Sequence, residues 1–292
     1  IEDGCDNNCT YCIIKKARGG VVSRPPEEVI AEVRQLAAAG CHEVILTGIE
    51  AASYGKDIGG YPLWRLMRET AAVEGIERVR TGSLEPSVLT KRFCDEIAAE
   101  PRIMPSFHLS LQSGSNAVLA AMKRRYNREQ VLKNTAYLRK AIPNVTFTCD
   151  IIVGFPGETE AEFEDTLRAL SDIRFDMIYS FIYSPRKGTP AAEMEQVPEE
   201  VQKNRFARML ELQNGVSMEK NQPLVGKTLR VLCDGVSKSN ADLWTGRTAG
   251  NKSVFFPGSP DTTPVGQFIP VRIERAAPFA LYGKAENPAD IL

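Results

Sequence analysis

The sequence predicts an α/β fold, a partial (β/α)6 barrel, followed by a small all-β domain. The first observation is that apolar strand candidates alternate with segments of helical periodicity, giving six strands if a stub at the chain start is counted. Such alternation indicates parallel strands joined by right-handed crossovers, and six units are too few to close an eight-stranded barrel. The second observation is a change of composition after Pro223, where short β-rich runs are separated by Gly, Pro, Ser and Asp.

The elements of the first domain follow in order. Residues 1–3 are interpreted as the stub of a strand, and Pro25 and Pro26 open a helix that ends at Gly40. Further strands are predicted at residues 43–47, 78–83, 106–111, 145–153 and 177–183, with helices at 63–73, 87–99, 115–122, 128–141 and 158–171. The strands are largely apolar, which is typical of strands buried on both faces.

The second domain is preceded by a long amphipathic helix, predicted over residues 199–220. Beyond this helix, short strands are predicted at residues 228–233, 252–256 and 267–274. We place the boundary near residue 222, so that residues 1–222 form the α/β domain with its trailing helix and residues 223–292 form the all-β domain.

Composition narrows the class of protein. The 292 residues are 43% hydrophobic and 25% charged, which is ordinary for a globular chain, and no apolar run is long enough to span a membrane. Seven cysteines, an odd number, argue against a disulfide framework and for a reducing compartment, so we expect a cytoplasmic protein. The net charge of −1 gives no general sign of nucleic-acid binding but leaves room for a local basic patch. The chain begins with Ile1 rather than Met, so we interpret it as part of a longer protein.

The densest chemical signal is the run that contains Cys5, Cys9 and Cys12, with Tyr11 before the last cysteine. Three thiols so close together indicate a soft metal or a 4Fe–4S cluster with one iron left open for a small molecule. The alternatives are a structural zinc site with a distant fourth ligand and three buried thiols. The spacing resembles the signature of the radical S-adenosylmethionine (SAM) superfamily. That resemblance implies that SAM binds the open iron and is split into methionine and a 5′-deoxyadenosyl radical.

Polar residues and glycines gather where the predicted strands end, which is where α/β folds of this kind bind ligands. Glu50 is a candidate for the SAM ammonium group, and Arg124 for its carboxylate. Gln112 and Asp150 are candidates for the ribose or the carboxylate side of SAM. The full set of predicted cofactor-binding residues is Tyr11, Glu50, Ser83, Glu85, Gln112, Arg124, Asp150 and Gly154. The two histidines, His42 and His108, are interpreted as structural, although His108 lies in a predicted strand and could face the barrel interior.

A closer resemblance, to the radical-SAM methylthiotransferases, covers essentially the whole chain. It rests on residues 4–14, 17–19, 23–25, 46–49, 53–55, 111–115, 122–126, 150–159 and 183–191. The pair Leu-Thr-Gly-Ile and Ser-Tyr-Gly, at residues 46–49 and 53–55, resembles the branch that modifies N6-threonylcarbamoyladenosine at position 37 of tRNA. The isopentenyladenosine branch and the branch that modifies a ribosomal protein usually differ at these residues, and a methylthiotransferase of either branch is the alternative. The resemblance implies a transferase that adds a methylthio group to C2 of the modified adenosine.

Two features depart from that family. Lys15 and Lys16 stand where the family often has proline and an aromatic residue. The family also has an N-terminal domain that carries three more cysteines and a second 4Fe–4S cluster. Sulfur insertion depends on that cluster in the family, so we expect the 292-residue chain alone to be unable to insert sulfur. The remaining cysteines are scattered singly and are interpreted as core or incidental thiols: Cys41, Cys94, Cys149 and Cys233.

The C-terminal part, from Leu224 to about Asn287, resembles a TRAM domain, a small OB-like barrel that binds RNA in the family. The resemblance and the residue types suggest a phosphate-binding and base-stacking surface, with Phe256 as a further aromatic candidate. The candidate RNA-binding residues are Lys227, Arg230, Trp244, Arg247 and Lys252. The alternative is a solvated barrel exterior around core aromatic residues.

We therefore expect an enzyme with tRNA as its substrate and an electron donor such as flavodoxin or ferredoxin, and no membrane partner; nothing in the sequence indicates an oligomeric state. The rival classes are a non-catalytic RNA-binding protein built around a structural metal and a simple electron carrier. An electron carrier usually binds its cluster through four cysteine ligands, and this motif has three, which argues against that class.

Overall fold

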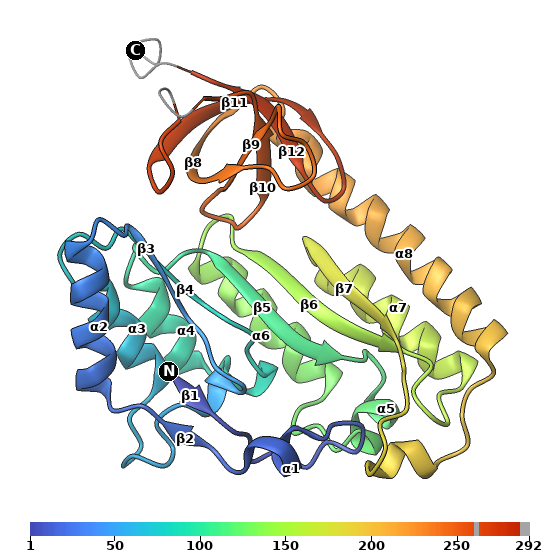
Figure 1. Cartoon of the computed structure of the whole chain (residues 1–292). Coiled ribbons are helices and arrows are strands. Elements are labelled where there is room, and N and C mark those ends of the chain that lie inside the picture. Colours follow the sequence, from blue (N-terminus) through green and yellow to red (C-terminus); the bar gives the residue numbers. More distant parts are fainter. Residues whose placement is uncertain (260–262, 287–292) are drawn as a thin grey trace.

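A computed structural model describes residues 1–259 and 263–286, and in it a broad α/β domain carries a small β-barrel at one end (Figure 1). Six parallel strands follow one another in chain order: β1 (Glu2–Asp3), β3 (Glu43–Leu46), β4 (Arg78–Thr81), β5 (Ser106–Gln112), β6 (Thr146–Val153) and β7 (Met177–Ile182). Single bridges, such as Glu2 to Gly48 and Leu84 to Leu109, join the pairs that lack a regular ladder. The predicted partial barrel of six units is therefore confirmed.

Helices lie along the outer side of these strands (Figure 1). They are α2 (Pro26–Ala38), α3 (Leu63–Ala71), α4 (Lys91–Ala98), α5 (Asn116–Ala121), α6 (Arg128–Ala141) and α7 (Glu160–Ile173), with α1 (Ile14–Arg18) and β2 (Val22–Ser23) after the cysteine loop. The predicted helix at 87–99 begins later, at Lys91, because the turn η2 (Pro86–Val88) precedes it and Thr90 caps its first turn by accepting from the Phe93 N–H at 3.2 Å. The strand β2, which pairs antiparallel with β1, was not predicted.

One expectation about the strands is wrong. The apolar strands are not buried on both faces, because the inner face of an open barrel remains hollow. On β7 the side chains alternate, so that Tyr179 and Phe181 are 46% and 51% exposed while Ile178, which precedes them, is buried. Ile45 on β3 is likewise 56% exposed. The barrel interior is therefore lined in part by accessible apolar side chains.

Helix α8 (Glu199–Asn221) packs beside β7 and leads through the turn η4 (Gln222–Leu224) to the small barrel (Figure 1). This barrel closes in the order β10 (Ser253–Phe256), β12 (Leu281–Ala285), β11 (Phe268–Ala276), β8 (Thr228–Val236) and β9 (Trp244–Arg247). The strands β9 and β12 were not predicted from the sequence. Both alternate buried and accessible residues only over four or five positions, which is a weak periodic signal.

The small barrel is fastened to the amino ends of the α/β strands. On β4, the Arg78 guanidinium donates to the carbonyls of Arg230 and Arg247, both at 3.0 Å. Arg80 donates to the carbonyls of Thr248 at 2.7 Å and Ala249 at 3.0 Å. Both arginines are buried and are also paired with Glu43. The small barrel therefore lies at the end of the α/β domain opposite the cysteine loop (Figure 1).

A second fastening point is Asp176, a buried carboxylate that accepts from Lys252 at 2.9 Å and from Lys220 at 3.0 Å. Burial alone would raise the pKa of Asp176, but the two ammonium groups outweigh it and hold the pKa below the ordinary value of 3.8. The ionised form is thus favoured by folding. Its contribution to stability is complete above about pH 4 and is lost as the pH falls through the lower folded value.

We expect Asp176→Asn to lower the free energy of unfolding by about 2 kcal/mol at pH 7, because two partly buried ammonium groups lose their counter-ion. Urea denaturation from pH 8 downward should show a constant difference from the unsubstituted chain to about pH 5, narrowing only below about pH 4. Asp172→Asn, on the exposed end of α7, is the matched control and should change little. A difference that does not depend on pH would contradict the ionic explanation.

Candidate cofactor site

The cysteine loop lies between β1 and α1, at the carboxyl ends of the strands. Thr10 anchors it to α5, since its N–H donates to the Met122 carbonyl at 3.2 Å and its hydroxyl to the Ala121 carbonyl at 2.8 Å. Gly4 has a φ of +80°, and a Cβ there would lie 1.9 Å from the Gly20 carbonyl oxygen, so this turn requires glycine. The loop is thus held by hydrogen bonds to the end of α5, and its Tyr11 also packs against an apolar cluster that includes Met122.

The three thiols of the loop are free and only partly buried. Burial raises the pKa of Cys5, and the Arg124 guanidinium donates to the Cys9 sulfur at 3.3 Å. Within the described residues, no three His, Cys, Asp or Glu side chains are already gathered as a closed metal site. The donor set fits an iron–sulfur cluster in number and softness, and binding would draw the short loop around it. The other cysteines do not compete: Cys94, Cys149 and Cys233 are buried singly, as predicted, and Cys41 is half-buried.

Buried carboxylates lie beneath the loop. Glu50 accepts from the Asn7 side-chain amide at 3.2 Å with one oxygen, while its other oxygen has no hydrogen-bond partner among the described residues. Glu85 accepts from the Ser87 hydroxyl at 2.7 Å, and its second oxygen lies 3.6 Å from Arg124 without forming a hydrogen bond. Burial and the neighbouring Glu85 raise the pKa of Glu50 to about 7, although Arg124 opposes the shift. Unsatisfied buried carboxylate oxygens fit a cationic ligand such as the ammonium group of SAM.

Arg124 is engaged differently from the prediction. Its Nε donates to the Tyr126 hydroxyl at 2.9 Å and its Nη2 to the Ser110 carbonyl at 3.0 Å. With Cys9 and Glu85 also beside it, the guanidinium ties β5 to the cysteine loop. Pairing with a SAM carboxylate would require it to exchange one of these partners.

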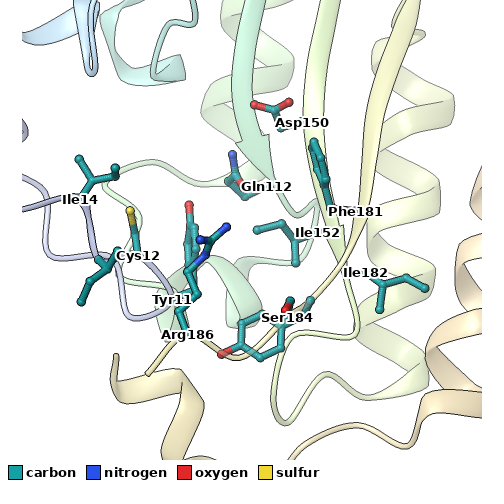
Figure 2. Close-up of a pocket in the computed structure, with 12 residues that line it drawn as sticks. Tyr11, Cys12, Ile14, Gln112, Asp150, Ile152, Phe181, Ile182, Ser184 and Arg186 are labelled. Atoms are coloured by element: carbon teal, nitrogen blue, oxygen red, sulfur yellow. The ribbon is translucent and has the colours of Figure 1, made fainter. Parts of the chain in front are cut away.

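A pocket of about 420 Å³ opens beside the cysteine loop (Figure 2). Among the predicted residues it brings together Tyr11, Cys12, Gln112 and Asp150, and Gln112 ends β5 with a φ of +68°, a strained backbone of the kind found at functional sites. Most of the remaining lining is apolar. It consists of Ile13, Ile14, Ile152, Phe181, Ile182, Tyr183, Ser184 and Arg186.

His108 was interpreted as structural, but it is tied to a pocket residue. Its Nε2 lies 3.1 Å from the Asp150 carboxylate and its Nδ1 lies 2.9 Å from the Thr148 hydroxyl. If Nε2 donates to Asp150, the Thr148 hydroxyl donates to Nδ1, so the pair selects one neutral tautomer and orients the carboxylate. The signal that would have found it is the register, since His108 on β5 is the partner of Thr148 on β6, two residues before Asp150.

Two predicted cofactor residues lie elsewhere. Ser83 is exposed after β4 and does not line the pocket. Gly154 packs against α8: a Cβ there would lie 2.5 Å from Gln202, whose side-chain amide donates to the Gly154 carbonyl at 3.2 Å. The need for glycine at this strand end therefore comes from helix packing and from its φ of +70°.

The predicted RNA-binding surface of the small barrel is not formed as expected. Trp244 is only 5% exposed and Phe256 is fully buried, because β9 and β10 turn these two rings into the barrel core. The Lys252 ammonium group donates to the Asp176 carboxylate and, at 2.8 Å, to the Asn221 side-chain oxygen. Arg230 pairs with Glu77 at 2.5 Å. Lys227 and Arg247 remain accessible, so the five residues do not form one open face.

An open parallel barrel with three thiols and incompletely paired carboxylates at its carboxyl edge defines a class of proteins, the enzymes that bind an iron–sulfur cluster together with SAM. Residues 1–170 match the Radical SAM superfamily, and the chain belongs to that superfamily. Membership implies a 4Fe–4S cluster and SAM as cofactors. Residues 222–285 match the TRAM domain, which agrees with the small closed barrel.

Curated relatives of this chain are tRNA-modifying enzymes by name. The tRNA-2-methylthio-N(6)-dimethylallyladenosine synthase of Desulfitobacterium hafniense is 42% identical over 286 residues, which cover 97% of this chain and 64% of the relative. The synthase of that name from Acetivibrio thermocellus is 44% identical over 282 residues, covering 96% and 58%. The chain thus spans about six tenths of the length of these relatives. Their names do not support the predicted threonylcarbamoyladenosine branch.

Solved structures share the fold at low identity. A radical SAM methyltransferase from Kitasatospora setae, solved with cobalamin and a 4Fe–4S cluster, has a TM-score of 0.55 at 19% identity and covers 65% of this chain and 37% of that chain. Coproporphyrinogen III oxidase from Escherichia coli has a TM-score of 0.53 at 15% identity, covering 85% and 65%. Over the described residues, no helix is both long and apolar enough to cross a membrane.

Proposed function

We propose that this chain is the radical-SAM and TRAM part of a tRNA methylthiotransferase, which adds a methylthio group to C2 of an N6-modified adenosine at position 37. The observation that carries the proposal is the meeting of three thiols and two incompletely paired carboxylates beside an apolar pocket. The names of the relatives and the TRAM match support tRNA as the substrate.

Each part of the site has a role in this proposal. Cys5, Cys9 and Cys12 hold the cluster, and Glu50 with Glu85 binds the ammonium group of SAM. When bound, the cluster and SAM supply the one-electron chemistry of the superfamily, while the protein provides binding and orientation. Asp150, oriented by His108, and Gln112 offer hydrogen bonds to ribose hydroxyls at the pocket wall. An electron donor such as flavodoxin or ferredoxin would reduce the cluster.

For the substituent on N6, we favour the dimethylallyl group that appears in the relatives' names. The pocket wall fits this group, because Ile152 and Phe181 present apolar surface next to Asp150. Burial of a branched five-carbon chain against that surface is favourable through the hydrophobic effect. Tyr179, exposed on the same strand as Phe181, extends this surface toward His108, with the two rings 5.4 Å apart.

The threonylcarbamoyl group is the second candidate, favoured by the likeness of residues 46–49 and 53–55 to that branch. In the structure this run belongs to the cofactor side of the site. Glu50 contacts Asn7 of the cysteine loop, while the Tyr54 hydroxyl donates to the Arg24 carbonyl at 2.8 Å. Glu50, Ser53 and Tyr54 are all buried, and none of them lines the pocket. A run that does not reach the pocket is a weaker guide to the substrate than the pocket wall itself.

The test is SAM cleavage by the reconstituted chain under dithionite, measured as 5′-deoxyadenosine by chromatography with three tRNAs. These carry unmodified adenosine, the dimethylallyl form or the threonylcarbamoyl form at position 37. We expect the dimethylallyl tRNA to accelerate release severalfold over the other two, because a correctly seated substrate consumes the radical. Acceleration by the threonylcarbamoyl tRNA alone would establish the second candidate. If a chain with a complete cluster releases no deoxyadenosine, the proposed enzymatic function is contradicted.

A further inference from the structure

Exposed basic residues surround the pocket at the carboxyl ends of the strands. They come from three segments: α1, the turn between α5 and α6, and the loop after β7. We call them the basic collar, which consists of Lys15, Lys16, Lys123, Arg125, Arg186 and Lys187. All six side chains belong to exposed residues, and Arg186 also lines the pocket (Figure 2).

The three segments of the collar are bound to one another. Lys16 donates from α1 to the Gly188 carbonyl at 2.5 Å, and the Ala191 N–H donates to the Thr10 carbonyl at 2.9 Å. Arg125 donates to the Asp6 carbonyl at 3.4 Å. Together with the bonds from Thr10 to α5, these contacts hold the three segments that carry the six cations together beside the pocket that Arg186 lines.

The collar cations lack counter-ions. Among the described residues, none of the six is within ion-pair distance of a carboxylate. Their acceptors are backbone carbonyls and the Asn8 side chain, which accepts from Lys15 at 3.0 Å. Elsewhere on the surface arginines are commonly paired, as Arg208 is with Glu160 and Glu164. Several unpaired cations around one mouth create a local positive potential that a chain of net charge −1 does not reveal.

We propose that the basic collar binds the phosphate backbone of the RNA whose base enters the pocket. This inference rests on the proposed function and deepens it. Phosphates on either side of a base that is turned out of its stack lie close to that base, so cations around the pocket mouth meet them. Two of the residues expected to bind phosphate from the small barrel are paired with carboxylates, Lys252 with the buried Asp176 and Arg230 with Glu77 on the surface. The collar therefore contacts the RNA at the reacting nucleotide, and the small barrel contacts it at a distance.

The test neutralises one cation from each segment, singly and together: Lys15→Gln, Lys123→Gln and Lys187→Gln. The matched control is Lys133→Gln with Lys140→Gln, two exposed lysines on the outer helix α6 that are also without an ion-pair partner among the described residues. Binding of the dimethylallyl tRNA is measured by fluorescence anisotropy over a range of KCl concentrations. Iron content is measured for each variant, which shows whether the cysteine loop is intact.

We expect the slope of log K against log salt to fall by about 0.7–0.9 for each single variant and by about 2–3 for the triple variant, with no change in the control. If the triple variant binds the normal amount of iron and its tRNA affinity and salt dependence are unchanged, the proposal is overturned. The collar would then be assigned to binding a protein partner. An equal loss of tRNA affinity in the control variant would also overturn the proposal, because the effect would then come from the net charge of the protein and not from the collar. If the collar variants bind tRNA more weakly but the chain releases no deoxyadenosine, the RNA-binding surface is supported and the proposed enzymatic function is rejected.

Discussion

Replacement of Cys5, Cys9 or Cys12 by alanine is expected to reduce bound iron from about four atoms per chain to near zero after anaerobic reconstitution. A cube with only two protein ligands loses its anchorage, and the four other cysteines lie singly, three of them buried, so none is placed to replace the missing one. Iron and sulfide analysis, together with the visible absorption of the cluster, measures the loss.

Cys41→Ala is the matched control, because Cys41 is also half-buried and free. It should bind as much iron as the unsubstituted chain. Stoichiometric zinc with no iron–sulfur absorption would instead point to a structural metal and to the non-catalytic RNA-binding class. Full iron content in any one of the three loop variants would remove that cysteine from the ligand set.

Glu50→Gln is expected to weaken SAM binding by about 10- to 100-fold, which corresponds to the loss of one charge-assisted hydrogen bond of roughly 1.5–3 kcal/mol. The substitution keeps the size of the side chain and an oxygen that can accept from Asn7, so the loop should remain in place. Anaerobic equilibrium dialysis with the reconstituted chain measures the affinity, and the cluster absorption should not change.

Stability provides a second measurement for this variant. Burial and Glu85 raise the pKa of Glu50 to about 7, so a neutral side chain relieves repulsion and the free energy of unfolding should not decrease. Glu28→Gln, an exposed change on α2, is the control for both measurements. Unchanged SAM affinity in Glu50→Gln would transfer the ammonium-binding role to Glu85. A fall in stability equal to the fall in affinity would indicate a structural role only.

Local patterns were sufficient for much of the α/β domain and for a specific prediction of the metal ligands. Alternating apolar runs and helical periodicity are properties of neighbouring residues, so the six parallel units could be read before any contact was known. The cysteine motif is local for the same reason, since a short loop can bring Cys5, Cys9 and Cys12 to one metal without help from distant segments.

The small barrel shows where local patterns fail. Trp244 and Phe256 looked like stacking residues, but in a strand the choice between core and surface depends on register, and a shift of one position exchanges the two faces. The accessible ring next to them is Phe255, which stacks on Tyr282 with the ring centres 5.6 Å apart. Lys252 likewise has the composition of an RNA contact, and only the docking of the two domains made it the partner of Asp176.

By itself, the sequence determined the class of fold and the superfamily, and it proposed the three cluster ligands, because each of these depends on spacing along the chain. Only the tertiary structure decided which polar groups meet. It paired His108 with Asp150 across two strands, left Glu50 with an unpartnered oxygen, and gathered cations from three segments around the pocket. These are contacts between residues far apart in sequence, and their distances follow from strand register and loop docking, which no local pattern encodes.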